Sequence, residues 1–386
     1  MRVSDDYCTQ IVSDLAAIGR ARWDELVAQD ADATVFLRFD FLHALHASGC
    51  AAPDTGWAPQ YLTLWQGDAL AAAVPLYIKG HSYGEYVFDW SWAEASERAG
   101  RRYYPKWLAA VPFTPVGGSR LVARDKASRT ALVDALLALA ESSGLSSLHL
   151  LFAPPAQLDL LTARGLLRRH GVQFHWRNAG YRTFDDFLAA LAQPKRKKIR
   201  AERRKVAEAG IVMQRKVGAE ISDDDWRFFH RCYSATYAAH GATPYLNLDF
   251  FRRIAAPLAP HLLLVLATRD GQRVAASLGV FDTNALYGRY WGAVEAVSCL
   301  HFEACYYQMI EFAIERGIAT FEGGAQGAHK LARGLDPVPT GSVHWIADPA
   351  LRAAVARFLV RERDHVAETL DELDEHRAFR MLPERE

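Results

Sequence analysis

Hydrophobic and polar residues alternate in two parts of the chain, in each case around a short turn. Residues 61–79 read YLTLWQGDALAAAVPLYIK, with strand-like runs on both sides of Gly67-Asp68. Residues 262–292 have the same pattern around Asp270-Gly271. Two-residue turns that contain glycine, placed between alternating apolar runs, are typical of β-hairpins. Each stretch therefore predicts antiparallel strands.

After each hairpin the spacing of apolar residues changes to the period of a helix. One amphipathic helix is expected over about 128–143 and another over about 301–316, and each ends before a glycine, the usual left-handed stop. A short strand is expected after each helix, at Leu148–Phe152 and at Ala319–Glu322. The order hairpin, further strand, helix, strand thus occurs twice, which indicates an internal duplication of an α/β unit.

The duplication predicts two α/β domains with mixed sheets, over residues 1–170 and 171–386. A chain of 386 residues has the length of two ordinary domains. The first copy is longer, largely because of residues 81–106, HSYGEYVFDWSWAEASERAGRRYYPK. Such an insertion is either a functional loop or a packed structural excursion. The substrate-binding candidates in it are His81, Tyr83, Glu85, Asp89, Tyr104 and Lys106.

The start of the second helix contains polar residues beside its apolar stripe. His301, Glu303 and Tyr307 lie near the N-terminal end, where helix starts and strand ends form ligand crevices in α/β folds. Glu311 and Glu315 continue the row at four-residue spacing and are explained by exposure to solvent. For His301, Glu303 and Tyr307 a functional and a structural role both stay open.

Two further segments carry candidate ligand contacts. The glycine-rich stretch FEGGAQGAHKLARG (321–334) supplies donors from Gln326, His329, Lys330 and Arg333, and it is either a ligand-binding loop or a flexible loop with incidental charges. In the strand YGRYWG (287–292), the two-residue period places Tyr287, Arg289 and Trp291 on one face. Arg289 is then either paired in a site or stacked on a tyrosine at the surface.

Residues 195–205 form a basic helix, with eight basic residues and one acidic residue, in a chain whose 45 basic and 45 acidic residues cancel. The run is either a solvated face or a contact for a phosphate-rich partner such as tRNA. Eight charges within three turns repel one another, which favours the anionic partner. The anion-binding candidates are Lys195, Arg196, Lys197, Lys198 and Arg203.

The remaining composition excludes several classes of protein. The five cysteines are scattered and have no metal-ligand spacing, which predicts free thiols in a reducing compartment and no metal site. There is no secretory signal and no run of 18 apolar residues, so the sequence predicts a cytoplasmic protein without a membrane span. Walker, dinucleotide-binding and zinc-protease motifs are missing, and no tightly bound cofactor is expected.

Longer phrases of the chain resemble the FemAB-like family of predicted N-acyltransferases, over about residues 60–380. These phrases are HSYGEYVFDW, YYPK, PFTPV, QFHWRNAGY, KRKKIRAER, YGRYWG, LHFEACYYQMIE and GAQGAHKLARG. The resemblance implies two tandem GNAT-like domains with a reaction cleft between them. Relatives of this family use aminoacyl-tRNA to acylate an amine on a peptidoglycan precursor. An acidic residue is expected in the GAQGxHK loop where this chain has Ala328.

Acylation of an amine needs a neutral nucleophile and hydrogen-bond donors for the tetrahedral oxyanion. Glu303 or His301 is the expected base, and His329 is a further catalytic candidate. Gln326, Lys330 and Arg289 are expected to contact an oxyanion or a carboxylate. The expected substrate contacts also include Trp291, Tyr307 and Arg333.

The acyl donor is open between two co-substrates. Aminoacyl-tRNA is favoured, because the segment GAVEAVSCLHFEACYY before the second helix has one glycine and is poorly suited to the pyrophosphate of acyl-CoA. The segment PVGGSRLVARDKASRT of the first half is a plausible anion cradle, which keeps an acyl-CoA-dependent enzyme acting on a small amine as the alternative. A non-catalytic module that binds tRNA or peptidoglycan is the second alternative. The acceptor is a small-molecule or peptide amine.

Overall fold

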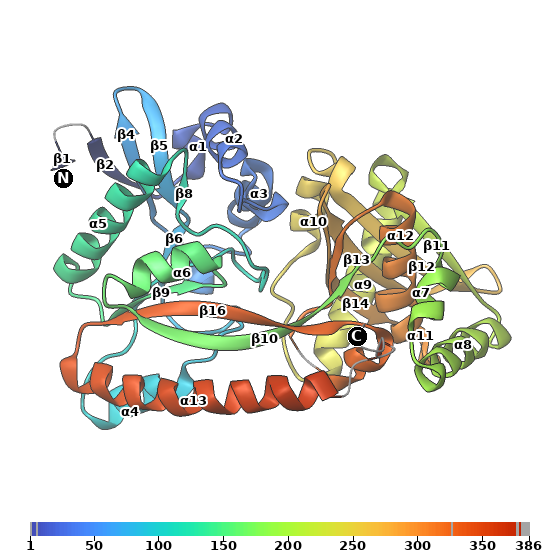
Figure 1. Cartoon of the computed structure of the whole chain (residues 1–386). Coiled ribbons are helices and arrows are strands. Elements are labelled where there is room, and N and C mark those ends of the chain that lie inside the picture. Colours follow the sequence, from blue (N-terminus) through green and yellow to red (C-terminus); the bar gives the residue numbers. More distant parts are fainter. Residues whose placement is uncertain (1, 5–6, 326, 376–377, 380–386) are drawn as a thin grey trace. The chain divides into compact units, whose positions relative to one another are not determined.

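The chain folds into two compact units in a computed structural model that describes residues 2–4, 7–325, 327–375 and 378–379 (Figure 1). Unit 1 comprises Met1–Gly171 and Thr340–Val366, and unit 2 comprises Val172–Pro339 and Ala367–Glu386. The units differ from the expected ranges 1–170 and 171–386 mainly in residues 340–366, which belong with the N-terminal part of the chain. The reason is that this segment pairs with a strand of unit 1.

Unit 1 contains two sheets and the helices that cover them. Its strands are β1 (Arg2–Ser4), β2 (Tyr7–Val12), β3 (Trp57–Pro59), β4 (Tyr61–Gln66), β5 (Ala69–Val74), β6 (Leu76–Lys79), β7 (Lys106–Ala109), β8 (Val122–Ala123) and β9 (Ser147–Leu151). Its helices are α1 (Leu15–Ile18), α2 (Arg20–Gln29), η1 (Val35–Leu37), α3 (Phe39–Ala47), η2 (Pro53–Thr55), α4 (Trp90–Arg98), α5 (Lys126–Ser142) and α6 (Pro155–Thr162). Both helix and strand ends follow local signals, such as the Asp125 side chain that caps α5.

The hairpin expected around Gly67-Asp68 is confirmed as β4 and β5, but it lies in a sheet of its own with the order β1-β2-β4-β5-β8. The strand β6 follows directly and joins the other sheet of the unit, with the order β16-β9-β7-β6-β3. The insertion at 81–106 connects β6 to β7 and contains α4. The expected helix over 128–143 and the strand after it are confirmed as α5 and β9.

Unit 2 is one mixed sheet with helices on both faces. Its elements are α7 (Phe184–Ala190), α8 (Gln193–Glu208), β11 (Ile211–Val217), η3 (Gly218–Glu220), α9 (Asp223–Ala239), α10 (Leu248–Ala255), η4 (Ala259–His261), β12 (Leu262–Arg269), β13 (Gln272–Phe281), β14 (Ala285–Ala293), α11 (Leu300–Phe302), η5 (Glu303–Tyr307), α12 (Gln308–Arg316), β15 (Thr320–Glu322) and η6 (Ala328–Arg333). Three elements contain residues of both units: β10 (Leu167–Arg177), β16 (Asp336–Ile346) and α13 (Pro349–Glu375).

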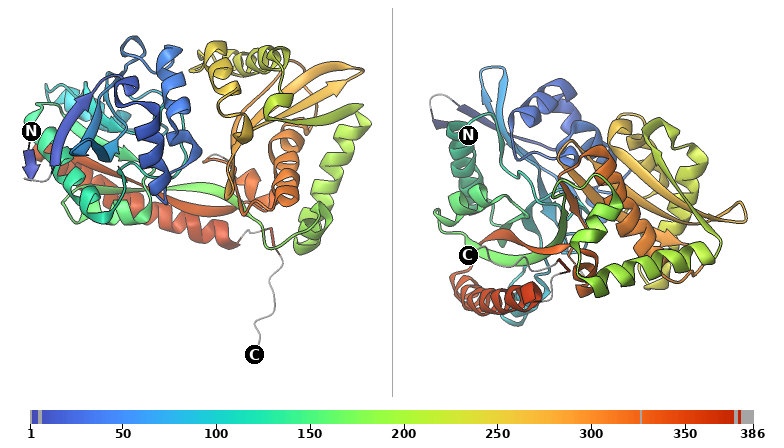
Figure 2. Two further views of the ribbon diagram at one scale, coloured as in Figure 1. Left: turned by 90° about the horizontal axis from the view of Figure 1, so that it is seen from above. Right: turned by 45° about the vertical axis from the view of Figure 1, so that its right-hand side comes forward.

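The strand order of unit 2 is β11-β12-β13-β14-β15-β10. The strands β11 to β14 are antiparallel neighbours, which can be followed in both views of Figure 2, and β15 lies parallel to β14. An antiparallel pair, then a helix, then a parallel strand is the same order as β6, β7, α5 and β9 in unit 1. This repeated topology supports the internal duplication, with β6–β7 corresponding to β13–β14. The hairpin expected around Asp270-Gly271 is confirmed as β12 and β13.

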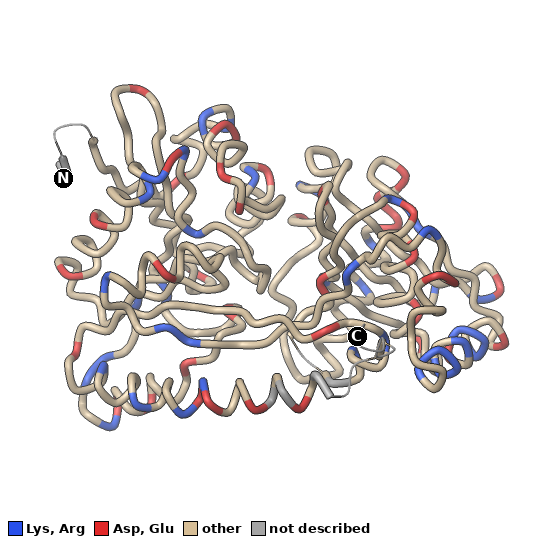
Figure 3. Tube along the Cα trace, viewed as in Figure 1, with Lys and Arg blue, Asp and Glu red and all other residues tan. Residues whose placement is uncertain are grey.

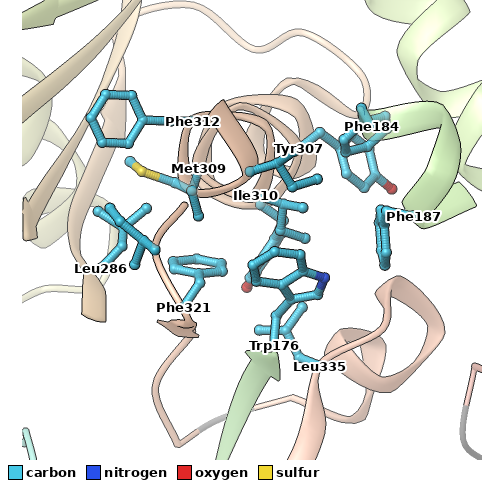
Figure 4. Packing of buried hydrophobic residues seen from close by; sticks show 14 of the residues in the cluster. Trp176, Phe184, Phe187, Leu286, Tyr307, Met309, Ile310, Phe312, Phe321 and Leu335 are labelled. Atoms are coloured by element: carbon cyan, nitrogen blue, oxygen red, sulfur yellow. The ribbon is translucent and has the colours of Figure 1, made fainter. Parts of the chain in front are cut away.

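The core of unit 2 lies between the sheet and α12. Trp176 of β10 packs edge to face on Phe187 of α7, with ring centroids 5.9 Å apart, and Phe321 of β15 and Met309 of α12 are fully buried (Figure 4). Burial of such large apolar side chains is the main favourable term in folding. None of the helices in the described parts of the chain combines the length and the apolar composition needed to cross a bilayer.

Candidate functional site

Strand β14 contains a β-bulge at Arg289. Leu278 of β13 pairs with Tyr290 and Gly279 pairs with Gly288, so Arg289 is the extra residue. A bulge reverses the alternation of side chains beyond it. The expectation that Tyr287, Arg289 and Trp291 share one face is therefore wrong for this strand, since Tyr287 pairs with Val280 and Trp291 with Ser277, and residues three apart in a regular strand face opposite sides.

The bulge directs neighbouring side chains to different helices. Tyr290 packs on Tyr233 of α9, with centroids 5.2 Å apart, whereas Trp291 packs on His301 of α11, with centroids 5.5 Å apart. The guanidinium of Arg289 lies 5.0 Å from the centre of the Tyr290 ring and donates a hydrogen bond of 3.3 Å to its hydroxyl. Strand β14 thus presents the guanidinium of Arg289 and the indole of Trp291 close together at the bulge.

A cavity of about 120 Å³ opens at this bulge within unit 2. Its lining residues come from β13, β14, the start of the central helix and the end of β15: Ser277, Gly288, Arg289, Tyr290, Trp291, His301, Cys305, Tyr306, Phe321 and Gly323. A second cavity of about 320 Å³ shares Trp291 and His301 with the first and is otherwise lined by residues 293–300. The expected site residues Arg289, Trp291 and His301 are thereby brought together.

The central helix is the helical segment after β14, which consists of α11, the π-helical turn η5 and α12. A π turn inserts one residue into the helical phase and is often found at functional sites. Cys305 and Tyr306 of this turn line the cavity, and the Cys305 thiol donates to the Ser277 hydroxyl at 3.5 Å. Burial lowers the pKa of His301 to about 4, and His329 and Lys330 add to this effect, so its imidazole is neutral at neutral pH.

Glu303, the expected base, is held by three hydrogen bonds. Arg203 of α8 donates to its two oxygens at 3.1 and 3.2 Å, and Gln308 donates at 2.8 Å. The side chain of Glu303 is 5% exposed, and Arg203 also pairs with Glu311 at 3.1 Å. These contacts favour a structural role for Glu303, which joins α8 to the central helix, and they engage Arg203, which was expected to bind an anion.

Arg333 and Tyr307 belong to a second buried network. Arg333 donates to Glu202 at 2.7 Å, to the Tyr307 hydroxyl at 3.0 Å and to the backbone carbonyl of His329 at 2.7 Å. The guanidinium also covers the ring of Phe302 at 3.4 Å, and the Tyr307 hydroxyl donates to Glu202. With 1% of its surface exposed, Arg333 holds η6 on α8 and has little access to a substrate.

The loop after β15 brings His329 and Lys330 towards the same helix start. The Tyr306 hydroxyl lies 3.2 Å from His329 Nε2, and burial lowers the pKa of His329, with further lowering by Lys330 and Arg333. Lys330 is buried, its ammonium lies 5.7 Å from the centre of the Phe174 ring, and burial lowers its pKa to about 8. Gln326 and the side chain of Ala328 lie outside the described residues.

Glu322, at the end of β15, was not among the residues expected from the sequence. Its side chain is 15% exposed, and its pKa is raised to about 8, first by burial and then by Asp282, while Arg289 acts against this rise. The sequence signal was a carboxylate at the end of a short strand before two glycines. That signal was overlooked because only the donors of the segment were considered.

The basic helix α8 buries Ile199 and Val206, and Figure 3 shows the run of lysine and arginine positions along it. Arg200 pairs with Asp185 at 3.3 Å and Arg204 with Glu208 at 3.6 Å. Within the described residues no carboxylate pairs with the other four expected anion-binding cations, Lys195, Arg196, Lys197 and Lys198. These four occupy the N-terminal half of the helix, where the macrodipole disfavours positive charge.

In unit 1, three of the expected substrate-binding residues form a buried ion cluster. Lys106 donates to Glu85 at 2.9 Å, to Asp89 at 2.5 Å and to the Ser82 hydroxyl at 2.8 Å, and its side chain is 0% exposed. Burial raises the pKa of Glu85 to about 7 against the effect of Lys106. For Asp89 burial acts in the same direction, but Lys106 and His149 hold its pKa well below its usual range. The cluster is inaccessible, which favours a structural role.

The other candidates of the insertion lie nearer the surface of unit 1. His81 packs on Tyr83, with centroids 5.3 Å apart, and the exposed Tyr83 packs on Trp90 of α4 at 4.8 Å. Lys79 donates to the backbone carbonyl of Tyr83 at 3.3 Å, and burial lowers its pKa to about 7. The Tyr104 hydroxyl lies 2.9 Å from that of Ser82. Only His81, Tyr83 and Tyr104 of the insertion candidates are thus partly accessible.

Comparisons with solved structures show the fold. The chain is similar to FemX, with 12% identity, a TM-score of 0.57, and coverage of 90% of this chain and 100% of FemX. It is also similar to the C-terminal domain of a putative lysylphosphatidylglycerol synthetase from Agrobacterium fabrum, at 13% identity and a TM-score of 0.54, covering 90% and 97% of the two chains. The third likeness is to L-PGS from Bacillus licheniformis, at 11% identity and a TM-score of 0.53, covering 89% and 96%.

These likenesses confirm the expected two-part GNAT-like α/β fold. A search of curated proteins gives no match. The model of the FemAB-like family, described as peptidoglycan biosynthesis/recognition, matches residues 14–381 and therefore nearly the whole chain. The family expected from the motifs is thereby confirmed: the chain belongs to the FemAB-like family.

Proposed function

We propose that this protein transfers an aminoacyl group from aminoacyl-tRNA to the amine of a peptidoglycan precursor or a related peptide, in the cytoplasm. The observation that carries the proposal is the cavity at the bulge of β14, where Arg289, Trp291 and His301 meet beside a π-helical turn. A β-bulge and a π turn both re-aim side chains, and both are common at functional sites.

The groups around this cavity suit acyl transfer without a covalent intermediate. The neutral imidazole of His301 lines this cavity and can exchange hydrogen bonds with a bound substrate. Lys330, whose lowered pKa of about 8 still lies above neutral pH so that its ammonium stays mostly charged, is the proposed donor to the developing oxyanion, together with Arg289. His329 is proposed to orient the Tyr306 hydroxyl at the edge of the cavity.

The donor is proposed from charge. The four cations in the N-terminal half of α8, for which the described residues supply no carboxylate partner, are unfavourable for the helix itself, so a bound phosphate backbone would compensate their charge. Acyl-CoA is less favoured, because the segment that lines the outer cavity before the central helix contains Glu295, paired with Arg269, where a pyrophosphate would need amide donors. A small peptide amine is the proposed acceptor.

The first test is product formation by the purified full chain. It is incubated with alanyl-tRNA or, separately, acetyl-CoA, together with alanine amide as the amine, and the amide product is measured by mass spectrometry. Product from alanyl-tRNA above the protein-free background supports the proposal. Product from acetyl-CoA alone favours the acyl-CoA alternative, and tight tRNA binding with no product from either donor favours a non-catalytic binding module.

The second test concerns α8. Changing Lys195, Arg196, Lys197 and Lys198 together to Gln is expected to weaken tRNA binding and to flatten its salt dependence by up to four phosphate contacts, each worth roughly 0.7–0.9 in the log–log slope. The control exchanges Arg200 and Arg204, which already face Asp185 and Glu208. An unchanged affinity and an unchanged slope in the fourfold variant would contradict a role of the helix in tRNA binding.

A further inference from the structure

Glu322 occupies a central place in the sheet of unit 2. It ends β15, pairs in parallel with Tyr287 of β14 and pairs antiparallel with His175 of β10. Directly paired residues lie on the same face, so Tyr287, Glu322 and His175 form a row across three strands. The next residue, Gly323, lines the cavity at the β14 bulge together with Arg289.

The half-buried carboxylate of Glu322 differs from the buried carboxylates described above because no hydrogen-bond donor to it is found within the described residues. The nearest group is His175, whose Nε2 lies 3.9 Å from Oε2, beyond hydrogen-bond distance. That Nε2 lies 3.3 Å from the side-chain oxygen of Gln173, which places its proton towards Gln173. Burial lowers the pKa of His175 to about 4, so it carries no charge that could pair with Glu322.

The surrounding charges leave Glu322 able to change its protonation state. Asp282 and the carboxylate repel each other, Arg289 attracts it, and Tyr287 donates its hydroxyl proton to Asp282 at 3.2 Å rather than to Glu322. Glu303, in contrast, is fixed as an acceptor by Arg203 and Gln308. A carboxylate that lacks donors and lies in a desolvated place binds a proton readily, which is what removal of a proton from an ammonium requires.

We propose that Glu322 is the proton acceptor for the attacking amine in acyl transfer, a step that rests on the proposed function. The acceptor ammonium gives one proton to Glu322 and becomes a neutral amine. Its nitrogen attacks the acyl carbonyl, a C–N bond forms, and the ester C–O bond to the tRNA ribose breaks. The second proton of the attacking nitrogen passes to the leaving ribose oxygen, and Glu322 releases its proton to solvent.

The positions of Arg289 and Glu322 indicate how the two substrates would be oriented. Arg289 lines the cavity at the bulge and attracts the carboxylate of Glu322. A donor carbonyl bound in the cavity would face Arg289, and an amine bound at Glu322 would approach from the end of β15. The acyl donor and the amine acceptor would thus meet across the bulge of β14.

Two nucleophiles separate base catalysis from a structural effect. Alanine amide carries a protonated amine at neutral pH and needs a base, whereas hydroxylamine is mostly neutral and needs none. With alanyl-tRNA as donor, Glu322→Gln is expected to slow formation of the amide by roughly 10²–10⁴-fold. Formation of the hydroxamate is expected to stay within a few-fold of the wild-type rate. The control Glu315→Gln, at an exposed residue paired with Arg215, should leave both rates unchanged.

Each result of this experiment either supports or overturns the assignment of Glu322 as the proton acceptor. Equal loss of both products in Glu322→Gln, or retention of both, overturns the assignment of Glu322 while the proposed function stands. If the wild-type protein forms neither product above background, the proposed function fails and the assignment fails with it. As a readout that does not require turnover, carboxyl NMR should show Glu322 titrating well above the ordinary range of glutamate, and titration within that range overturns the proposal.

Discussion

The role of Glu303 can be decided by the variant Glu303→Gln. The substitution keeps the size and shape of the side chain but removes its charge. In the wild type the carboxylate accepts two hydrogen bonds from Arg203 and one from Gln308, at 2.8–3.2 Å, and its side chain is 5% exposed. A glutamine has one acceptor oxygen, so at least one of the donors from Arg203 or Gln308 loses its partner.

The expected cost follows from these contacts. A hydrogen bond to a charged group contributes about 1.5–3 kcal/mol. Arg203 is 29% exposed and keeps its ion pair with Glu311, so water and Glu311 compensate part of the loss. We expect the free energy of unfolding to fall by about 2 kcal/mol in Glu303→Gln. In Glu311→Gln, where the carboxylate is 28% exposed, we expect less than about 1 kcal/mol.

Urea unfolding followed by circular dichroism measures these changes, and the rate of amide formation from alanyl-tRNA is measured at a temperature where both variants stay folded. A structural Glu303 predicts lower stability with a rate within a few-fold of wild type. The opposite result, unchanged stability with a rate lowered 100-fold or more, would refute this reasoning and would return Glu303 to the role of base that the sequence first indicated.

Two further predictions concern unit 2. Burial holds the pKa of His301 at about 4, below its value of 6.5 in the unfolded chain. The wild type should therefore lose up to about 2–3 kcal/mol of stability as the pH falls from 6.5 to 4. In the same acid-unfolding series, His301→Phe should lose less stability over this pH range. Equal pH dependence of both proteins would contradict the buried neutral imidazole. In Gly292→Ala the new methyl group would overlap with the backbone carbonyl of Cys232, so thermal unfolding should show a loss of stability of at least about 2 kcal/mol. The control Gly117→Ala, whose new methyl group would meet no atom within 4 Å, should leave the stability nearly unchanged. A similar loss in both variants would count against the close packing of α9 on β14.

Elements with strong local signals were predictable from the sequence. The turn at Gly67-Asp68, the glycine after α5 and the one after α12 mark their boundaries without reference to the rest of the chain. The pairing of strands was not predictable in the same way, because β5 and β6 follow each other directly within one apolar run and only long-range contacts assign them to different sheets.

The segments that form the candidate site were predictable from the sequence, but the roles of the individual residues were predictable less well. Arg289, Trp291 and His301 do meet at one cavity. The bulge that changes their direction cannot be read from the alternation of residues in the strand. The partners that fix Glu303 and Arg333 come from α8, 100 and 131 residues earlier in the chain. Glu322 was missed because the sequence does not show which hydrogen-bond donors lie near its carboxylate in the fold.

The composition of unit 1 has a consequence for how the chain is made. Ser342–Ile346 of β16 pair with β9, so one edge of β9 has no neighbour until residues 342–346 have been synthesised. At the usual rate of ~5–20 residues per second, the ribosome needs roughly ten to forty seconds to pass from the end of β9 to that strand. During this interval the N-terminal sheet presents an open edge, a surface that readily pairs with other chains.

Meanwhile most of unit 2 leaves the ribosome as one continuous stretch, residues 172–339. Its central sheet and the helices on it are therefore available for folding before the sheet of unit 1 is complete. A chain released before Ser342 would keep the edge of β9 permanently open and would leave the buried His149 of that strand without its partner His344, whose Nδ1 lies 2.6 Å from Nδ1 of His149 in the finished protein. Translation of residues 342–346 thus decides whether the sheet that contains β9 is completed.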